Sequence, residues 1–170
     1  MTPALQYLDA SQGLLNRVRE QLSLVQQAAD MFAQTILAGQ MVHVFGSGHS
    51  RILVEEMWPR YGSFPGFNPI VELSLTFHNL VVGANGQRQA MFLENVPGLA
   101  ERILRNFAIR PVDTACIISS SGCNVVLALL AGVAGKKFIL SYSCGKDSTL
   151  CLHKMLEAGA EPMADRKSVV

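Results

Sequence analysis

Two short segments rich in glycine and serine are the residues best suited to chemistry in this sequence. The first, Gly46–Ser50, reads Gly-Ser-Gly-His-Ser, and the second, Ser119–Asn124, reads Ser-Ser-Ser-Gly-Cys-Asn. Backbone N–H groups in such a turn form a concave cluster of donors that suits a phosphate, and serine adds hydroxyl donors without bulk. One such turn is a weak signal, because α/β proteins need glycine there for geometry alone. Two of them together predict an anionic ligand.

The elements that must position these turns are short apolar strands, each followed by a turn and a helix. Three such units begin at Met41–Phe45, Ala115–Ile118 and Phe138–Tyr142, and His43 is predicted to be a packed residue of the first strand. Short apolar strands that alternate with helices indicate a parallel sheet covered on both faces. Because ligands bind at the carboxyl ends of the strands in such a sheet, we expect the turns to share one edge.

The first forty residues predict one long helix before the first strand. Apolar residues recur at spacings of three and four, and Gly39 follows where a C-terminal cap is expected. A seam this regular packs either on its own domain or against the same helix of another subunit, and both alternatives stay open. The seam consists of Leu15, Val18, Leu22, Val25, Ala29, Phe32 and Ile36.

The stretch between the first two strand units is less regular. Phe64–Asn68 is rich in turn residues, Ile70–Leu73 is predicted to be a short strand and Gly83–Gly86 a loop. A helix starting at Pro97 is predicted to bury Leu99, Ile103 and Phe107.

Composition indicates one ordinary domain. The chain has 170 residues, of which 49% are hydrophobic and 16% charged, and this excludes a disordered chain. A net charge of +1 argues against electrostatic binding of nucleic acid or of an anionic membrane over a broad surface. The N-terminus lacks the features of a signal peptide, and the longest apolar stretch, Val125–Ala134, is too short to span a bilayer. We therefore expect a cytoplasmic protein with neither nucleic-acid nor membrane partners.

The cysteines form no C-x-x-C pair and have no paired histidines beside them. Small buried or turn residues in a reducing compartment are the favoured interpretation, rather than disulfides or zinc ligands, so no metal is expected. The four are Cys116, Cys123, Cys144 and Cys151.

Several motifs occur in the order seen in SIS (sugar isomerase) domain proteins, and the chain resembles this family over about residues 1–127. The branch it resembles most is the small stand-alone SIS proteins related to phosphoheptose isomerases. The resemblance implies a three-layer α/β/α sandwich with a parallel sheet, a homodimer or higher homo-oligomer, and a phosphosugar ligand. The motifs are Val42–Ser50, Glu55-Glu56, Asn68–Glu72, His78-Asn79 and Ile117–Asn124.

The same resemblance gives the two turns different roles. In the family the later turn binds the phosphate group of the ligand, and the earlier turn lies beside the sugar. The phosphate side maps onto Ser119, Ser120, Ser121 and Gly122, followed by Asn124. The sugar side maps onto Gly46, Ser47, Gly48, His49 and Ser50.

Four residues are candidates for acid–base chemistry, since aldose–ketose isomerisation needs a base that moves a proton between adjacent carbons. Glu72 and His78 have apolar flanks, so an inward-facing side chain would be partly desolvated; a structural hydrogen-bonded pair is the equal alternative. His49 either contacts the sugar or makes a local hydrogen bond. Glu55, expected with Glu56 to begin the first helix after the turn, is either catalytic or solvated.

The third turn resembles a different family. Residues 136–162 are similar to the opening of a PP-loop ATP pyrophosphatase of the diphthine–ammonia ligase type. The resemblance implies that this turn binds the β,γ-pyrophosphate of ATP, with magnesium, while lysine neutralises charge. The S-x-G-K-D-S pattern is matched by Ser143, Gly145, Lys146, Asp147 and Ser148.

The two resemblances do not fit together as complete domains, because a PP-loop domain needs far more chain after its motif. We expect residues 1–135 to form a shortened SIS-like domain, 136–162 to add a β-turn-α unit to the same sheet, and 163–170 to be a tail. The predicted function is binding of a phosphorylated sugar or sugar derivative without a further cofactor, in an isomerase or a sensor. The alternatives are an AMP-forming PP-loop ligase fragment and a non-catalytic dimerisation module.

Overall fold

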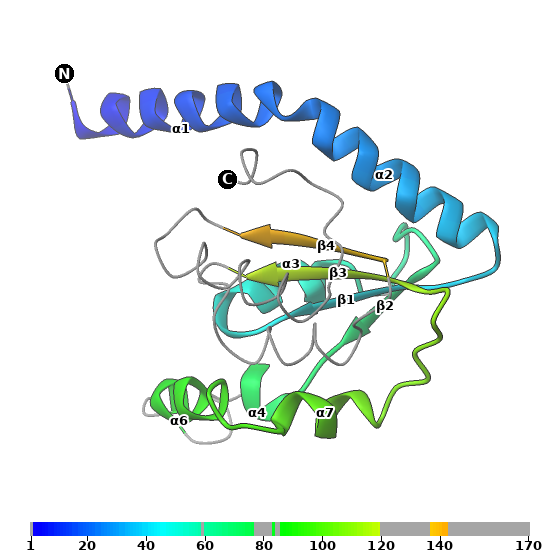
Figure 1. Ribbon diagram of the computed structural model, residues 1–170. Coiled ribbons are helices and arrows are strands. Elements are labelled where there is room, and N and C mark those ends of the chain that lie inside the picture. Colours follow the sequence, from blue (N-terminus) through cyan, green and yellow to red (C-terminus); the bar gives the residue numbers. More distant parts are fainter. Residues whose placement is uncertain (1, 59, 77–82, 84–85, 120–136, 143–170) are drawn as a thin grey trace.

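A computed structural model describes residues 2–58, 60–76, 83, 86–119 and 137–142, and it has an α/β architecture built on a parallel sheet (Figure 1). The described helices are α1 (Pro3–Glu20), α2 (Leu22–Leu37), η1 (Gly48–Ser50, a 3₁₀ helix), α3 (Arg51–Glu56), α4 (Leu73–Thr76), α6 (Gly86–Leu93) and α7 (Leu99–Leu104). The described strands are β1 (Val42–Gly46), β2 (Phe67–Ile70), β3 (Thr114–Ser119) and β4 (Lys137–Tyr142).

The four described strands lie in the order β2-β1-β3-β4, and every pair is parallel. Val42 of β1 is opposite Phe67 on one side and Thr114 on the other, and Thr114 is opposite Lys137 of β4. The prediction of an α/β fold with a parallel sheet after N-terminal helical structure is confirmed. The predicted apolar strands are β1, β3 and β4, each shifted or extended by one residue or more.

Helices cover both faces of the sheet. The chain moves from β1 through α3 to β2 in one direction, and from β2 through α4, α6 and α7 to β3 in the other. Since such crossovers are right-handed in nearly all proteins, α3 and α7 lie on opposite faces. Figure 1 shows α4, α6 and α7 grouped on the side of the molecule away from α2.

The core on the α2 and α3 face is aliphatic and aromatic. Val42 and Val44 of β1 cluster with Val54 of α3, and Phe32 and Ile36 of α2 pack against this cluster. Strand alternation turns the intervening residues of β1 to the other face. There, Phe45 is 1% exposed.

The N-terminal helical segment differs from the single helix expected. It consists of α1 and α2, separated at Gln21, whose φ of −105° and ψ of 9° are not helical. Hydrogen bonds still cross the junction, from Gln21 N to Val18 O at 3.0 Å and from Val25 N to Gln21 O at 3.1 Å. Only α2 packs against the sheet, through Phe32 and Ile36. Because α1 has no buried residue, packing does not hold α1 in line with α2.

The end of α2 agrees with its prediction. Gly39 has φ of +70°, and its N–H donates to Ile36 O at 2.9 Å. The next N–H, that of Gln40, donates to Thr35 O at 3.0 Å. This left-handed cap is a conformation that glycine adopts at little cost.

The strand predicted at Ile70–Leu73 is wrong by three residues, because β2 begins at Phe67 and ends at Ile70. Phe64–Asn68 was expected to be a turn, yet the strand is Phe67–Ile70, and Leu73 begins α4 instead of ending a strand. Asn68 and Pro69 are typical turn residues, but β2 lies at one end of the described sheet. Proline is tolerated there when its nitrogen faces away from the neighbouring strand.

Two helix starts also differ from expectation. Gly86, predicted to be in a loop, begins α6. The helix expected from Pro97 begins at Leu99, after Gly98 with φ of +79°. Ile103 is buried as predicted, whereas Leu99, the first residue of α7, is only half-buried, and Phe107 lies beyond the end of α7 and is also half-buried. None of the helices among the described residues is long and apolar enough to cross a membrane.

Candidate functional site

The carboxyl ends of β1 and β3 bring the first predicted turn beside the first residue of the second. In the parallel register Gly46, the last residue of β1, is opposite Ile118 of β3, and Ser119 ends β3. The Gly46–Ser50 turn and the start of the serine-rich turn are therefore neighbours at one edge of the sheet. Ser119 is buried, at 9% exposure. The predicted phosphate-side residues Ser120, Ser121, Gly122 and Asn124 lie outside the described residues.

Glycine is required at position 46 by a close backbone approach. A Cβ placed there would lie 2.8 Å from the carbonyl oxygen of Ser50 and 3.2 Å from that of Ile118. The turn folds back on itself, since the N–H of Ser50 donates to the carbonyl of Ser47 at 3.1 Å. Gly48 has φ of +55°. The Gly-Ser-Gly spacing thus builds a compact backbone loop at the sheet edge.

Arg51 holds this loop from the helix side. Its Nη1 donates to the carbonyl oxygen of Gly48 at 3.2 Å, and its Nε is 3.3 Å from Oε1 of Glu55. The prediction had not singled out Arg51. Its position next to the turn and its four-residue spacing from Glu55 are the signals that point to it.

Glu55 and Glu56 lie at the end of α3, not at its beginning as predicted, because α3 starts directly after Ser50. Glu55 takes part in the ion pair with Arg51, and exposed Glu56 pairs with Arg60. Both carboxylates thus have partners on their own segment, one turn away.

Glu94 places a carboxylate beside the Gly46–Ser50 turn. It follows α6, and a Cβ on Gly48 would lie 3.3 Å from its Oε1. A carboxylate accepts hydrogen bonds from hydroxyl groups and repels a phosphate. The prediction missed Glu94, because it comes from a separate helix and belongs to no local motif.

Glu72 follows β2 at the same edge and stabilises the start of α4. Its Oε1 accepts hydrogen bonds from the backbone N–H of Ser74 at 3.2 Å and from the Ser74 hydroxyl at 2.9 Å. Its side chain is half-buried. Among the other acid–base candidates, His49 lies in η1, and His78 lies outside the described residues.

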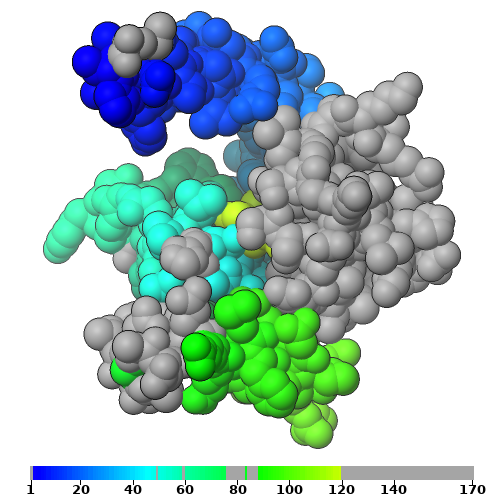
Figure 2. Space-filling view, turned by 90° about the vertical axis from the view of Figure 1, so that its left-hand side faces the viewer, coloured from blue at the N-terminus to red at the C-terminus, as the bar shows by residue number. Residues whose placement is uncertain are grey.

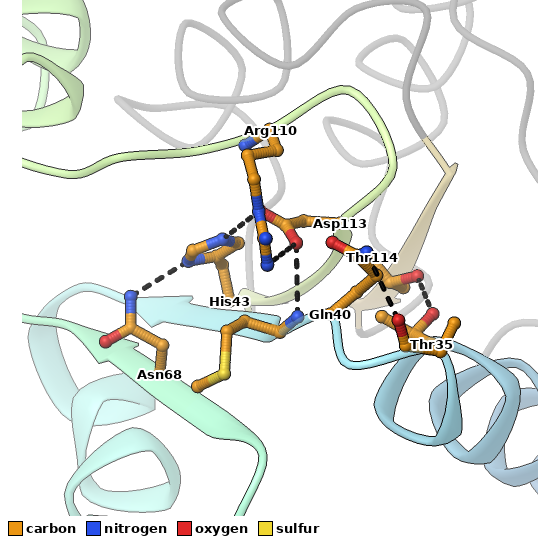
Figure 3. A network of polar contacts seen from close by, with 9 residues as sticks. Thr35, Gln40, His43, Asn68, Arg110, Asp113 and Thr114 are labelled. Atoms are coloured by element: carbon orange, nitrogen blue, oxygen red, sulfur yellow. Dashed lines mark hydrogen bonds and ion pairs between the residues drawn. The ribbon is translucent and has the colours of Figure 1, made fainter.

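A buried polar network lies near the opposite, amino-terminal end of the strands (Figure 3). His43 is buried as predicted, at 4% exposure; its Nε2 is 3.1 Å from Oδ2 of Asp113, and its Nδ1 is 2.9 Å from the amide nitrogen of Asn68. The amide nitrogen only donates, so Nδ1 accepts and Nε2 carries the proton that Asp113 accepts. The network joins β1, β2 and the residue before β3.

The carboxylate of Asp113 is surrounded by donors. Burial would raise its pKa, but hydrogen bonds from the backbone N–H groups of Arg110, at 2.8 Å, and Met41, at 3.1 Å, outweigh burial. The side chains of His43 and Arg110 act in the same direction, and the net result is a pKa below the ordinary value of an aspartate. Asp113 therefore stays ionised although it is 2% exposed.

Cys116 is the one cysteine among the described residues, so the expectation of small packed cysteines is tested there. It is a free, half-buried thiol, and burial raises its pKa to about 11. Cys116 therefore fits the expectation of a packed, unreactive residue. The other three cysteines lie outside the described residues.

The fold defines a class: α/β domains built on a parallel sheet, a class in which ligands generally bind at the carboxyl ends of the strands. The model of the SIS domain family matches residues 6–137. The chain belongs to this family.

Similar proteins are found in several bacteria. A UPF0309 protein of Listeria monocytogenes is 29% identical over 171 residues, covering 96% of this chain and 67% of the relative. Those of Geobacillus kaustophilus and Streptomyces coelicolor are 33% and 32% identical, covering 71% and 81% of this chain. The chain spans 49% and 55% of those two relatives.

Proposed function

We propose that the chain binds a phosphorylated sugar or sugar derivative at the carboxyl edge of the sheet. Membership of the SIS family supports a carbohydrate-derivative ligand. The observation that carries the proposal is the register of β1 and β3, which sets Gly46 opposite Ile118 and so brings the Gly46–Ser50 turn beside Ser119.

The charges of the described residues favour one orientation of the ligand. The Glu94 carboxylate lies close to Gly48, and the Arg51 guanidinium at the same turn is already paired with Glu55, so the earlier turn suits sugar hydroxyls better than a phosphate. The phosphate then belongs at Ser119 and the serines that follow it in sequence. This is the same assignment that the family resemblance implies.

Ligand-dependent thermal stabilisation tests the proposal. Hexose, heptose and aminosugar phosphates are compared with inorganic phosphate and with the same sugars without phosphate. A binding sugar phosphate raises the melting temperature, because a ligand that binds only the folded state stabilises it. Ser119→Ala reduces the shift, and Ser11→Ala on α1 is the matched control that keeps it. A full panel without any shift would contradict the proposal.

We also propose that any isomerase activity uses Glu72 with His78, since aldose–ketose isomerisation needs a base that moves a proton between adjacent carbons. Glu72→Gln keeps an oxygen for Ser74 and removes the base, so the fold is retained while proton transfer is lost. Incorporation of solvent deuterium at the carbon next to the carbonyl measures this step. A binding protein in which neither wild type nor Glu72→Gln exchanges deuterium is a sensor.

A second candidate ligand is ATP, favoured by the position of β4. This strand ends at Tyr142 on the same edge as β1 and β3, so the turn that begins at Ser143 starts there. ATP with magnesium would then be held by the Ser143–Ser148 turn, and Lys146→Ala abolishes binding in calorimetry. One observation weighs against the ligase alternative. The Listeria relative aligns with 96% of this chain, which supports the proposal that residues 136–162 are part of the SIS-like domain and not of a separate ligase.

A further inference from the structure

Gly48 lies beside two charged side chains that come from different elements. Arg51, the first residue of α3, donates from Nη1 to the carbonyl oxygen of Gly48 at 3.2 Å. Oε1 of Glu94, which follows α6, would lie 3.3 Å from a Cβ placed on Gly48. Figure 2 shows the side of the molecule toward which the strand arrows of Figure 1 point, and there the cyan segment that contains the turn adjoins the green segment that contains α6. Both charges therefore lie at the carboxyl edge of the sheet.

The positive charge of Arg51 is already balanced. Its Nε is 3.3 Å from Oε1 of Glu55, and both of these atoms are buried. Neither atom makes a hydrogen bond, so the two side chains are held together mainly by their opposite charges. Arg51 therefore adds no uncompensated positive charge to the turn.

The Glu94 carboxylate discriminates between ligand groups by their charge. Sugar hydroxyls donate hydrogen bonds to a carboxylate, whereas an ionised phosphate or carboxylate offers it acceptors and a like charge. Glu94 is half-buried, and burial reduces the screening of such a repulsion by water and salt. A hydroxyl group is therefore accepted beside Gly48, and an anionic group is repelled.

This carboxylate and the proposed phosphate position lie at different points of the edge. Ser119 ends β3, whereas Gly48 lies two residues after the end of β1 at Gly46. Since neighbouring strands are about 4.8 Å apart, a sugar whose phosphate lies at Ser119 is long enough to place its other end beside Gly48. Glu94 therefore acts on the end of the ligand that is remote from the phosphate.

We propose that Glu94 is a specificity-determining residue, which restricts the ligand to sugar monophosphates without a second anionic group. This inference rests on the sugar-phosphate proposal and goes beyond it, because it names the ligands that the site rejects. Sugar bisphosphates and phosphorylated sugar acids are rejected at the turn, although they carry the same first phosphate. No proton transfer is assigned to Glu94.

Calorimetric titration with matched pairs of ligands tests the proposal. The two ligands of a pair share one sugar skeleton and one phosphate, and only one of them has a second anionic group. The wild-type chain is expected to bind the monophosphate more tightly than its doubly anionic partner, by about tenfold or more. The pairs are glucose 6-phosphate with 6-phosphogluconate, fructose 6-phosphate with fructose 1,6-bisphosphate, and sedoheptulose 7-phosphate with sedoheptulose 1,7-bisphosphate.

Two substitutions separate the charge of Glu94 from its shape. Glu94→Gln keeps the shape and removes the charge, so the preference for the monophosphate is expected to disappear. Glu94→Asp keeps the charge on a shorter side chain, so the preference is expected to persist. A merely structural role predicts the reverse order, because glutamine fills the same space and aspartate does not. Glu101→Gln, at an exposed position of α7, is the matched control for the loss of one negative charge and keeps the wild-type preference.

The outcomes separate a failure of Glu94 from a failure of the ligand class. If no monophosphate binds, the sugar-phosphate proposal fails, and the role of Glu94 fails with it. If a monophosphate binds and its doubly anionic partner binds wild type equally well, or if Glu94→Gln keeps the preference, only the role of Glu94 is refuted. A wild-type preference that does not decrease from low to high salt refutes it as well, because salt screens repulsion between charges, and this measurement needs no variant.

Discussion

Gly46 shows how one residue sets the geometry of the site. The backbone of Ser50 returns to within van der Waals distance of Gly46, so a side chain has no room there. The Gly-Ser-Gly-His-Ser motif could be found from the sequence because all its determinants are local. The roles of Glu94 and Asp113 could not be found in this way, because each depends on a residue far away in the chain. Glu94 lies beside Gly48, and Asp113 accepts a hydrogen bond from His43.

Gly46→Ala is expected to destabilise the fold. The new Cβ would lie 2.8 Å from a carbonyl oxygen that is part of the backbone, so the turn must shift. Overpacking of this kind costs about 1–3 kcal/mol, measured by chemical denaturation. Gly13→Ala on α1 is the control, since its Cβ meets nothing within 4 Å. Equal stability of Gly46→Ala and wild type would show that the turn is looser than described.

Asp113→Asn is expected to lower the free energy of unfolding at pH 7 by about 1–3 kcal/mol. Every group that contacts the carboxylate is a donor, so the amide NH₂ of asparagine finds no acceptor.

The pH dependence identifies the cause. The pKa of Asp113 is lower in the folded state than in the unfolded state, so its stabilisation is complete above the unfolded value and is lost as the pH falls through the folded one. Below about pH 5 wild type should therefore lose stability more steeply than Asp113→Asn. Asp9→Asn, an exposed change on α1, keeps the wild-type slope. Identical slopes for wild type and Asp113→Asn would exclude this explanation.

The elements are joined by polar contacts as well as by apolar packing. The Thr35 hydroxyl is 2.6 Å from that of Thr114 (Figure 3), which links α2 to the first residue of β3. The Thr35 hydroxyl also donates to Met31 O at 2.9 Å. Both threonines are buried. The apolar runs of β1, β3 and β4 were predictable from the sequence, because buried parallel strands have that composition. The break at Gln21 and the strand at Asn68-Pro69 were not, because tertiary position decides them.

Thr35→Val is expected to cost about 1–3 kcal/mol, since it leaves the Thr114 hydroxyl buried without its partner. The double variant Thr35→Val, Thr114→Val should recover part of this loss, because removing both hydroxyls leaves neither unsatisfied. A double-mutant cycle by urea denaturation measures the coupling. Additive losses would mean that the two hydroxyls do not stabilise each other.

At the scale of the whole molecule, the sheet separates two regions. The candidate ligand site is at the carboxyl edge, and the His43–Asp113 network is near the amino edge. The family model ends at residue 137, where β4 begins, yet β4 pairs with β3 along its full length. The stability of the domain therefore depends on a segment that the family match does not include.

A chain that ends at residue 136 is expected to fold less stably and to aggregate. Without β4, the backbone of β3 becomes an unpaired strand edge, which promotes association with other chains. Melting temperature and light scattering are compared with those of the full chain and of a chain that lacks only residues 163–170. A truncated chain as stable and monodisperse as that control would show that β4 is dispensable.

Pro69 gives the two ends of the described sheet different capacities to accept a further strand. The carbonyl of Gly66 faces β1, where it accepts the N–H of Val42 at 2.9 Å, so the alternation along β2 turns the nitrogen of Pro69 outward. Proline on that side blocks the addition of another strand, whereas the described residues of β4, Lys137–Tyr142, include no proline. At the β2 end the described sheet is therefore closed to strand addition, which protects this edge from association with the edges of other sheets.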